Sequence, residues 1–251
     1  MTLPSGWAFV LGHPGHELRV FHLAERVRPV VSVLTDGSGS TGHARLTETT
    51  ALLESAGARR GPVYGPFSDA TAYGHLMRGE SAPFAALADA LARHFVDAEI
   101  SAVLVDAAEG YNPMHDICHW VGREAAASAA RNGRAIRVFE VDLVGTPDGS
   151  GGGLRLELDD AAFERKLAAV NRYGALAGEA ASAIAEHGLA AFRTEFVRDV
   201  APAELPDASW VPHYERVGEE RVRQGRYTSV LRYSSHVRPV LAALRTTTVE
   251  V

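Results

Sequence analysis

The sequence predicts an α/β protein with a Rossmann-like, doubly wound, mostly parallel sheet and helices on both of its faces. Short apolar runs rich in β-branched residues alternate with segments of helical length through the first half of the chain. Polar and glycine-rich stretches follow several of these runs, as they do at the carboxyl ends of parallel strands. With 251 residues, the chain has the length of one large domain.

The first 145 residues hold the elements of the expected core. Pro29 to Leu34 is the clearest buried strand, because it is apolar and β-branched. The other strands are expected at residues 7–11, 61–67, 102–105 and 135–144, and the helices between them at 18–25, 44–56, 82–96 and 117–131. Pro14 suits the first turn of a helix, where its missing N–H is not needed.

Residues 146–251 are expected to form a C-terminal α/β extension of the same single domain. A stretch rich in Gly and Asp, Thr146 to Gly153, separates it from the 1–145 core. An edge strand is expected at 154–158, followed by a helix from Ala161 to His187 with Asp160 as its N-cap. An apolar stripe along that helix indicates packing. Residues 201–212 are expected to be a loop, and 232–244 a final short helix.

Composition limits the classes of function. The formal net charge of -6 argues against a general nucleic-acid binder, which would need a basic face. The single cysteine, Cys118, excludes an internal disulfide and favours a reducing compartment. No apolar run approaches the roughly 18 residues of a membrane span. We therefore expect a cytoplasmic protein with a small-molecule substrate, and leave a homo-oligomer open.

The stretch Gly12-His13-Pro14-Gly15-His16-Glu17 lies between the first strand and the first helix. Two imidazoles and a carboxylate thus stand where open α/β sheets bind their ligands. The alternative is an ordinary turn with surface histidines. The spacing of the glycines does not match the G-x-G-x-x-G fingerprint, which argues against a dinucleotide site.

A second cluster, His115-Asp116-Ile117-Cys118-His119, follows the strand expected at 102–105. The two clusters converge if the two strands are neighbours, because adjacent strands lie ~5 Å apart. His119 together with His13 and His16 would supply three imidazoles, which is the ligand number of a catalytic zinc site with one open position. Imidazole also suits other transition metals. Cys118 could ligate as a thiolate, but a free cysteine is more often a small buried apolar residue.

Both clusters resemble motifs of the PIG-L/LmbE-like de-N-acetylase superfamily. Residues 13–17 are similar to its first motif, His-Pro-Asp-Asp-Glu. Asp116-Ile117-Cys118-His119, followed by an apolar pair and Gly122, is similar to its second motif, His-Pro-Asp-His. Thr35-Asp36-Gly37 and Arg45-Leu46-Thr47-Glu48 add weaker similarities. Lys166-Leu167-Ala168-Ala169 and Ala191-Phe192-Arg193-Thr194-Glu195 are similar to the family's C-terminal region, so the resemblance covers roughly residues 7–200.

The resemblance implies a metal site held by His13, His16 and His119, with Zn²⁺ or another divalent transition metal. An imidazole replaces a carboxylate at position 16, which would make the metal a stronger Lewis acid. Gly15 replaces the aspartate that acts as general base in the family. The candidate replacements are Asp116, Glu17 and His115, with Asp116 preferred and with Asp106 and Glu109 as weaker alternatives.

The residues expected to bind substrate are Arg45, Asp36, Glu48 and Asn112. A guanidinium can hold a polar or anionic group through paired hydrogen bonds. Alternatively, Arg45 and Glu48 form an ordinary ion pair on a helix surface. The loop from Asp36 to Gly42 could cover a substrate, or it could be a plain connection.

These observations lead to three hypotheses. The first is a metal-dependent hydrolase that cleaves an N-acyl group from an amino sugar or a related small metabolite. The second keeps the fold and the metal but has non-deacetylase chemistry, which the loss of the base at Gly15 would suit. The third is a catalytically inactive scaffold that binds a metal or ligand. The identity of the metal and activity on N-acetyl sugars would separate them.

Overall fold

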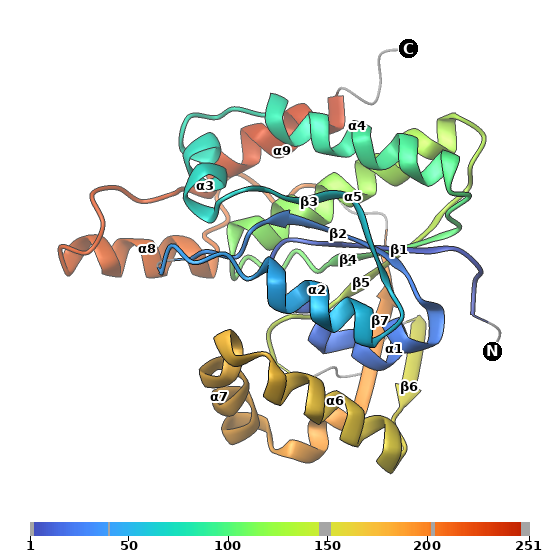
Figure 1. Ribbon diagram of the computed structural model, residues 1–251. Helices are drawn as coiled ribbons and strands as arrows, with labels where there is room; N and C mark the ends of the chain where they lie inside the picture. The colour runs from blue at the N-terminus through green and yellow to red at the C-terminus, as the bar shows by residue number, and fades with distance from the viewer. Residues whose placement is uncertain (1–2, 40, 146–151, 202–203, 247–251) are drawn as a thin grey trace.

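One seven-stranded sheet, in the order β3-β2-β1-β4-β5-β7-β6, organises the computed structural model (Figure 1). The structure describes residues 3–39, 41–145, 152–201 and 204–246. The strands are β1 (Trp7–Leu11), β2 (Val30–Thr35), β3 (Arg59–Phe67), β4 (Ala102–Asp106), β5 (Arg137–Val141), β6 (Gly153–Glu157) and β7 (Thr194–Asp199). The predicted α/β class with a mostly parallel sheet is confirmed.

The neighbours of β1 decide where a ligand can bind. β1 pairs in parallel with β2 on one side and with β4 on the other, with Val10 opposite Val105 in the second pair. The chain moves outward from β1 to β2 and β3, then returns to β4 and β5. Strand order therefore reverses between β1 and β4, and the crevice at such a point is the usual binding site of open α/β sheets. The two histidine-rich clusters follow these two strands, as their convergence requires.

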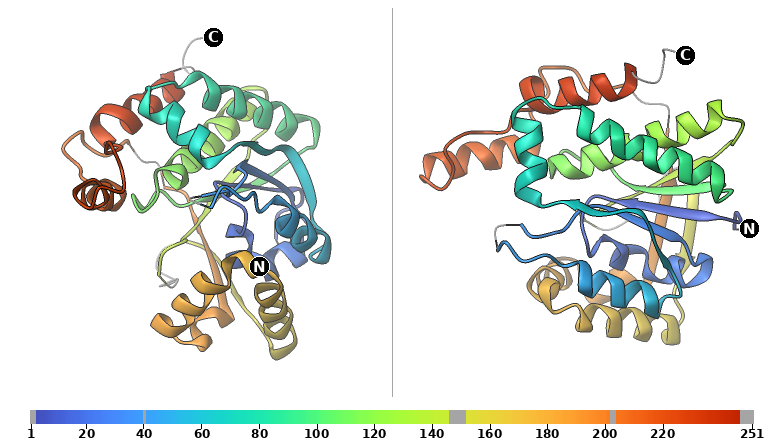
Figure 2. Two further views of the ribbon diagram at one scale, coloured as in Figure 1. Left: turned by 60° about the vertical axis from the view of Figure 1, so that its left-hand side comes forward. Right: turned by 45° about the horizontal axis from the view of Figure 1, so that its top comes forward.

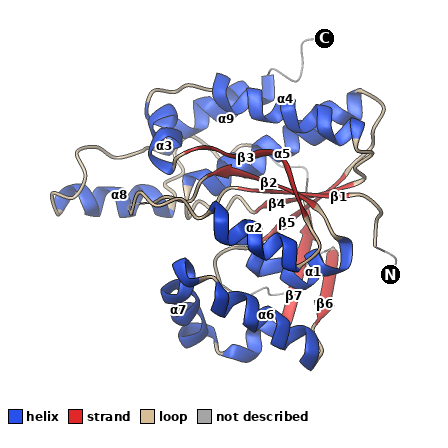
Figure 3. Cartoon of the chain, viewed as in Figure 1, coloured by secondary structure: helices blue, strands red, loops and turns tan. Residues whose placement is uncertain are grey.

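Helices cover both faces of the sheet (Figures 2 and 3). Side chains alternate along β1, so Ala8 and Val10 pack on one side and Trp7, Phe9 and Leu11 on the other. The first side is covered by α3 (Asp69–Met77), α4 (Ala82–Asp97), α5 (Pro113–Arg131) and α9 (Arg238–Thr246). The opposite side is covered by α1 (Phe21–Val27), α2 (Leu46–Ser55) and α6 (Asp160–Arg172), and α7 (Ala177–His187) lies beside α6.

The helix expected at 117–131 begins earlier, at Pro113, and this changes the site. The Asn112 side chain accepts a hydrogen bond from the backbone N–H of Met114, and Pro113 occupies the first helical position. Both features are standard helix starts. His115 and Asp116 therefore lie in the first turn of α5. In the first motif, a short 3-10 helix, η1 (His16–Val20), precedes α1, and Pro14 stands before it rather than inside it.

The single helix expected from Ala161 to His187 is wrong. It divides into α6, the short η2 (Gly174–Leu176) and α7, because the helical path breaks at Tyr173 and Gly174. The N-cap is Asp159, one residue before the expected Asp160. The apolar stripe packs only in part: Phe163 is buried, whereas the described side chains of α7 are all at least partly exposed.

Three elements were not expected from the sequence: α3, β7 and α8 (His213–Arg223). β7 pairs antiparallel with both β5 and β6, which places β6 at the sheet edge as predicted. The final helix is present as η4 (Tyr233–Val237), a π-helical turn, followed by α9. The linker expected from Thr146 lies mostly outside the described residues, so the division into core and extension stays a prediction.

A buried ion pair ties the C-terminal extension to the first motif. Lys166 Nζ of α6 lies 2.8 Å from Glu195 Oε1 of β7 and 3.0 Å from the carbonyl of Arg19. The two oxygens of Glu195 also accept the backbone N–H groups of His22 and Leu23 at the start of α1. The extension therefore holds the segment that follows His16 through buried polar bonds.

Among the described residues, no helix combines the length and apolarity that crossing a bilayer requires.

Candidate metal centre

The ends of β1 and β4 are joined by a carboxylate. Asp106, the last residue of β4, is fully buried, and its Oδ2 accepts the backbone N–H of Gly12 at 2.7 Å. A Cβ on Gly12 would lie 2.9 Å from the same oxygen and 3.1 Å from the carbonyl of Met114. Position 12 thus requires glycine for the close approach of β1 to the β4–α5 connection.

Three imidazoles meet at this end of the sheet: His13, His16 and His115. Their ring centroids are 5.3 Å apart for His13–His16, 5.5 Å for His13–His115 and 4.8 Å for His16–His115. The rings are nearly perpendicular to one another, at 69° to 90°. Three histidines bound to one zinc at ~2.1 Å in tetrahedral geometry have ring centroids about 5 Å apart. The spacing of the rings therefore fits a shared ion.

In two of the three rings, Nδ1 lies within hydrogen-bonding distance of a carboxylate. Nδ1 of His16 lies 2.8 Å from Asp106 Oδ2, and Nδ1 of His13 lies 3.1 Å from Asp69 Oδ1 and 2.8 Å from Thr35 Oγ1. Histidine ligands usually present their second nitrogen to such groups. Burial acts to raise the pKa of Asp69, but the hydrogen bond and the charge of His13, together with the backbone N–H of Gly39, outweigh it and hold that pKa well below its ordinary value.

Asp69 and Thr35 were not among the candidate site residues. Asp69 is in the first turn of α3, directly after the end of β3, and Thr35 is the last residue of β2. Polar residues at strand ends were the signal that identified the other clusters. The same signal would have selected Asp69, had the helix that follows it been recognised.

The environment of His115 favours the uncharged form of its ring. It is buried, and its Nδ1 has no hydrogen-bond partner among the described residues, nor has Nε2 of His13. Burial, together with the charges of His16 and His13, puts the pKa of His115 well below its ordinary value. That shift favours the neutral ring, which is the form that binds a metal.

His119, expected as the third ligand, is held by other groups. Its Nδ1 lies 3.1 Å from the carbonyl of Asp106, its Nε2 lies 3.3 Å from Nη1 of Arg123, and its ring packs against Trp120. Burial, followed by the charge of Arg123, lowers the pKa of His119 to about 4. His115 is one helical turn earlier on α5, and it is this residue that the structure brings to His13 and His16.

The start of α5 offers a different match to the second motif. Asn112-Pro113-Met114-His115 keeps the proline and the final histidine of His-Pro-Asp-His. In that register the motif's last histidine falls on His115, in agreement with the ring geometry. The motif's first histidine then falls on Asn112 and its aspartate on Met114.

The donor set and the ring spacing fit a transition metal, but the ligand atoms are not in a finished coordination geometry. Within the described ranges, no three His, Cys, Asp or Glu side chains are placed so that together they could hold a metal ion. The chemistry of the residues does fit a metal: three imidazoles are neighbours, two buried ring nitrogens have no partner in the described part of the chain, and two of the rings face a carboxylate.

Glu17, one of the candidate bases, is engaged in structural bonds. Its Oε2 accepts the backbone N–H of Gly15, and its Oε1 accepts the hydroxyl of Thr49. Burial raises the pKa of Glu17, although these hydrogen bonds oppose the shift. With both oxygens bonded inside the fold, the carboxylate shapes the turn that carries His13 and His16.

Asp116 lies in the first turn of α5, where its Oδ1 accepts the backbone N–H of Gly110. Its Oδ2 is buried and has no hydrogen-bond partner in the described parts of the chain. Burial raises the pKa of Asp116 to about 7, with a smaller contribution from Glu109. Glu109, a weaker candidate, instead accepts the backbone N–H groups of Leu143 and Val144. Asp106 is the carboxylate behind His16.

The expected substrate residues lie on the loop after β2, at the start of α2 and at the N-cap of α5. Arg45 lies beside the first motif, since a Cβ on Gly37 would be 2.7 Å from Arg45 Nε and 2.8 Å from Pro14. That Nε is buried and has no hydrogen-bond partner among described atoms. Asp36 bonds to the backbone N–H of Ser38 in the adjoining loop, and Glu48 is half-buried on α2. Asn112 caps α5 and accepts the hydroxyl of Tyr73.

Cys118 is a buried apolar contact, not a ligand to the three rings. Its Sγ donates to the carbonyl of Val10, and burial raises the pKa of the thiol well above its ordinary value. The thiolate that metal binding would need is therefore disfavoured.

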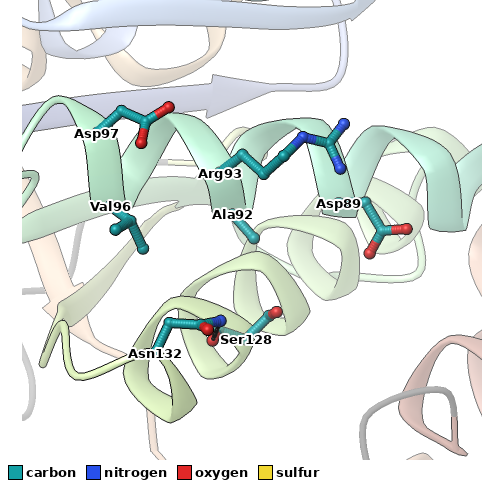
Figure 4. Close-up of a pocket in the computed structure, with 7 residues that line it drawn as sticks. All are labelled: Asp89, Ala92, Arg93, Val96, Asp97, Ser128 and Asn132. Carbon is teal, nitrogen blue, oxygen red and sulfur yellow. Dashed lines mark hydrogen bonds between the residues drawn. The ribbon is translucent and has the colours of Figure 1, made fainter.

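A surface groove of about 260 Å³ lies elsewhere, between α4 and the far end of α5 (Figure 4). Its lining includes Asp89, Arg93 and Asp97 of α4 and Ser128 of α5. Ser128 lies thirteen positions after His115 on the same helix, which is about 20 Å along the axis. The groove is therefore separate from the three histidines at the strand ends.

The chain shares its fold with solved deacetylase structures. The A40926 pseudoaglycone deacetylase Dbv21 matches with a TM-score of 0.51 and 19% identity over 80% of this chain and 99% of that one. A triple mutant of the deacetylase Orf2 from teicoplanin biosynthesis matches with a TM-score of 0.50 and 15% identity, over 79% of this chain and 100% of that one.

A third structure, the conserved protein TT1542 from Thermus thermophilus, matches with a TM-score of 0.51 and 16% identity, over 81% of this chain and 98% of that one. No family model and no curated protein matches the sequence. At these identities the likeness shows a common fold, and it agrees with the fold that the two motifs implied.

Proposed function

We propose that the protein is a metal-dependent hydrolase that removes an N-acyl group from an amino sugar or a related small metabolite. The observation that carries the proposal is the meeting of His13, His16 and His115 at the β1/β4 crevice. The shared fold with deacetylases supports the choice of reaction. Zn²⁺ is the ion we expect, because three imidazoles and an open position are typical of catalytic zinc.

When bound, the metal would polarise the acyl carbonyl and lower the pKa of a bound water toward ~7. The protein's side chains would hold the three histidine rings in place and orient the substrate. His13 and His16 are braced from behind by Asp69 and Asp106, and His115 is placed by the capped start of α5. Arg45, whose Nε has no partner among the described residues, would bind a polar or anionic group of the substrate.

For proton transfer we retain Asp116 as the candidate. Its Oδ2 has no partner among the described residues, whereas both oxygens of Glu17 are bonded and His115 serves as a ligand. Asp116→Ala should then reduce turnover strongly while metal content stays unchanged. Undiminished turnover would remove Asp116 from the mechanism.

One observation favours a second candidate, a metal-dependent protein of the same fold with non-deacetylase chemistry or with none. Leu176 of η2 fills the space beside Gly15, where the family's base would project. Asn112 stands in place of the first histidine of the second motif in the register described above. This second candidate predicts metal binding without N-acyl hydrolysis.

The test is elemental analysis of protein purified without a polyhistidine tag, next to a His13→Ala, His16→Ala, His115→Ala triple variant. About one equivalent of metal that the triple variant loses would support the centre. A screen of N-acetyl sugars with the metal-loaded protein then separates the two candidates. Absence of metal, even after dialysis against zinc, iron or nickel, would overturn both.

A further inference from the structure

The ring of His13 can bind a metal through Nε2 only if its single neutral proton is on Nδ1. A neutral imidazole carries one N–H and one lone pair, and its neighbours decide which nitrogen has which. Nε2 of His13 is buried and unpartnered within the described structure, while Nδ1 faces both Asp69 Oδ1 and Thr35 Oγ1. The neighbours of Nδ1 therefore select the tautomer.

Both oxygens of Asp69 act as acceptors from fixed directions. Oδ1 faces His13 Nδ1 at 3.1 Å, and Oδ2 accepts the backbone N–H of Gly39 at 2.6 Å. The Gly39 N–H can only donate. Thr35 Oγ1 lies 3.1 Å from the carbonyl of Gly12, to which it donates, so its lone pairs face His13. A hydroxyl can rotate and exchange these roles, but an ionised carboxylate can only accept.

We infer that Asp69 is a positioning residue that holds the proton of His13 on Nδ1 and leaves Nε2 free as the metal donor. Asp69 belongs to α3 and also bonds to Gly39 of the loop after β2, so it links three separate segments of the crevice. The part of the inference that concerns metal binding rests on the proposed function. The part that concerns the tautomer of His13 does not, because the tautomer is a property of the metal-free protein.

The pair His16–Asp106 provides a matched contrast. There a single oxygen, Oδ2, faces both donors, His16 Nδ1 and the backbone N–H of Gly12, while Oδ1 has no partner among the described residues. An asparagine at 106 can place its carbonyl oxygen where Oδ2 stands and keep both bonds. An asparagine at 69 cannot, because its two ends face one donor each.

Asp69→Asn should therefore reverse the tautomer of His13. If the amide oxygen stays on the Gly39 N–H, the amide NH₂ faces Nδ1 and donates to it. The ring proton then moves to Nε2, which blocks metal binding at that nitrogen. Asp69→Ala is the milder change by this argument, because Thr35 still accepts from Nδ1 and nothing donates to it.

The experiment has two readouts on wild type, D69N, D69A and D106N. Long-range ¹H–¹⁵N NMR spectra of the metal-free proteins, with H13A and H16A for assignment, report which ring nitrogen is protonated. Zinc affinity is measured by competition with a chromophoric chelator. We expect Nδ1–H at His13 in wild type, D69A and D106N, and Nε2–H in D69N. Zinc affinity should fall about 10- to 100-fold in D69N and less in the other two.

A His13 ring that keeps its proton on Nδ1 in D69N would overturn the inference, and so would a larger loss of zinc affinity in D69A than in D69N. If Asp69 had only a structural role, D69A would lose more zinc affinity than D69N, because truncation to alanine removes more contacts than the change to asparagine. If the wild type binds no zinc, the proposed function fails, and the NMR spectra alone still decide the role of Asp69.

Discussion

Leu176 fills the space into which a side chain at position 15 would project. A Cβ built on Gly15 collides with Cδ1 of Leu176, and Gly15 has a φ of 103°, which is unfavourable for residues with a side chain. Leu176 comes from η2, in the C-terminal extension, and Tyr173 flanks the same position. A side chain at position 15 would therefore compete with Leu176 for the same space, so the effect of a substitution at one position depends on the residue at the other.

This contact predicts how much stability the protein loses when the aspartate of the family motif is introduced at position 15. Gly15→Asp should lower the free energy of unfolding by about 2–4 kcal/mol, from backbone strain and from overpacking against Leu176. Leu176→Ala in the same chain should recover the overpacking part, about 1–3 kcal/mol, and leave the strain. Urea unfolding of the two single variants and the double variant measures both parts.

Gly174→Asp is the control for that cycle. Gly174 lies on η2 together with Leu176. A Cβ at position 174 meets no atom within 4 Å, and the φ of Gly174 is not positive. We expect Gly174→Asp to change the free energy of unfolding by less than about 1 kcal/mol. Purely additive effects of Gly15→Asp and Leu176→Ala would show that the two positions do not compete for space.

The two histidines of α5 should differ in their effect on metal binding. His115→Ala removes a ring from the three-imidazole cluster, and we expect loss of tightly bound metal. His119→Ala removes a ring whose nitrogens face Asp106 and Arg123, so metal stoichiometry should stay near that of the wild type. Elemental analysis and zinc competition on matched preparations measure the difference. Loss of metal in the His119 variant alone would restore the ligand set first expected from the sequence.

Arg45 should act on substrate binding rather than on stability. Its Nε has no partner among the described residues, so Arg45→Lys removes a donor that the fold itself does not use. We expect KM to rise about tenfold with little change in kcat, because a lysine cannot make the paired bonds of a guanidinium. Steady-state kinetics on whichever N-acyl substrate the screen identifies would measure this. Arg93→Lys, in the distant groove, is the matched control and should leave KM unchanged.

The Lys166–Glu195 pair should be important for the stability of the whole fold. Lys166→Met leaves a buried carboxylate without its counter-ion, which costs about 3–5 kcal/mol. The exposed pair Arg155–Glu157 provides the comparison, and Arg155→Met should cost less than about 1 kcal/mol. Chemical unfolding of both variants tests the contrast. Equal and small effects would mean that the extension does not depend on the buried pair.

Much of the fold was predictable, because it depends on local pattern. The apolar runs of β1, β2 and β4 are long enough and β-branched enough to be recognised as buried strands, and the alternation with helices indicates a parallel sheet. The polar stretch after β1 identified the end of the sheet where the three histidines meet, because it follows a recognisable strand. By contrast, α8 and β7 are less apolar, and their helical or extended state depends on what they pack against.

The sequence by itself determined the α/β class, the crevice after β1 and the candidacy of His13 and His16, since these follow from strand pattern and from residues close together in the chain. The tertiary structure decided that His115 rather than His119 joins them, because the helix starts at the Asn112 cap and this sets the direction of each side chain. It also decided that Asp69 stands behind His13 and that Leu176 closes the space at Gly15. Those contacts join segments more than fifty residues apart, and such pairings depend on how the whole chain packs, which no local pattern records.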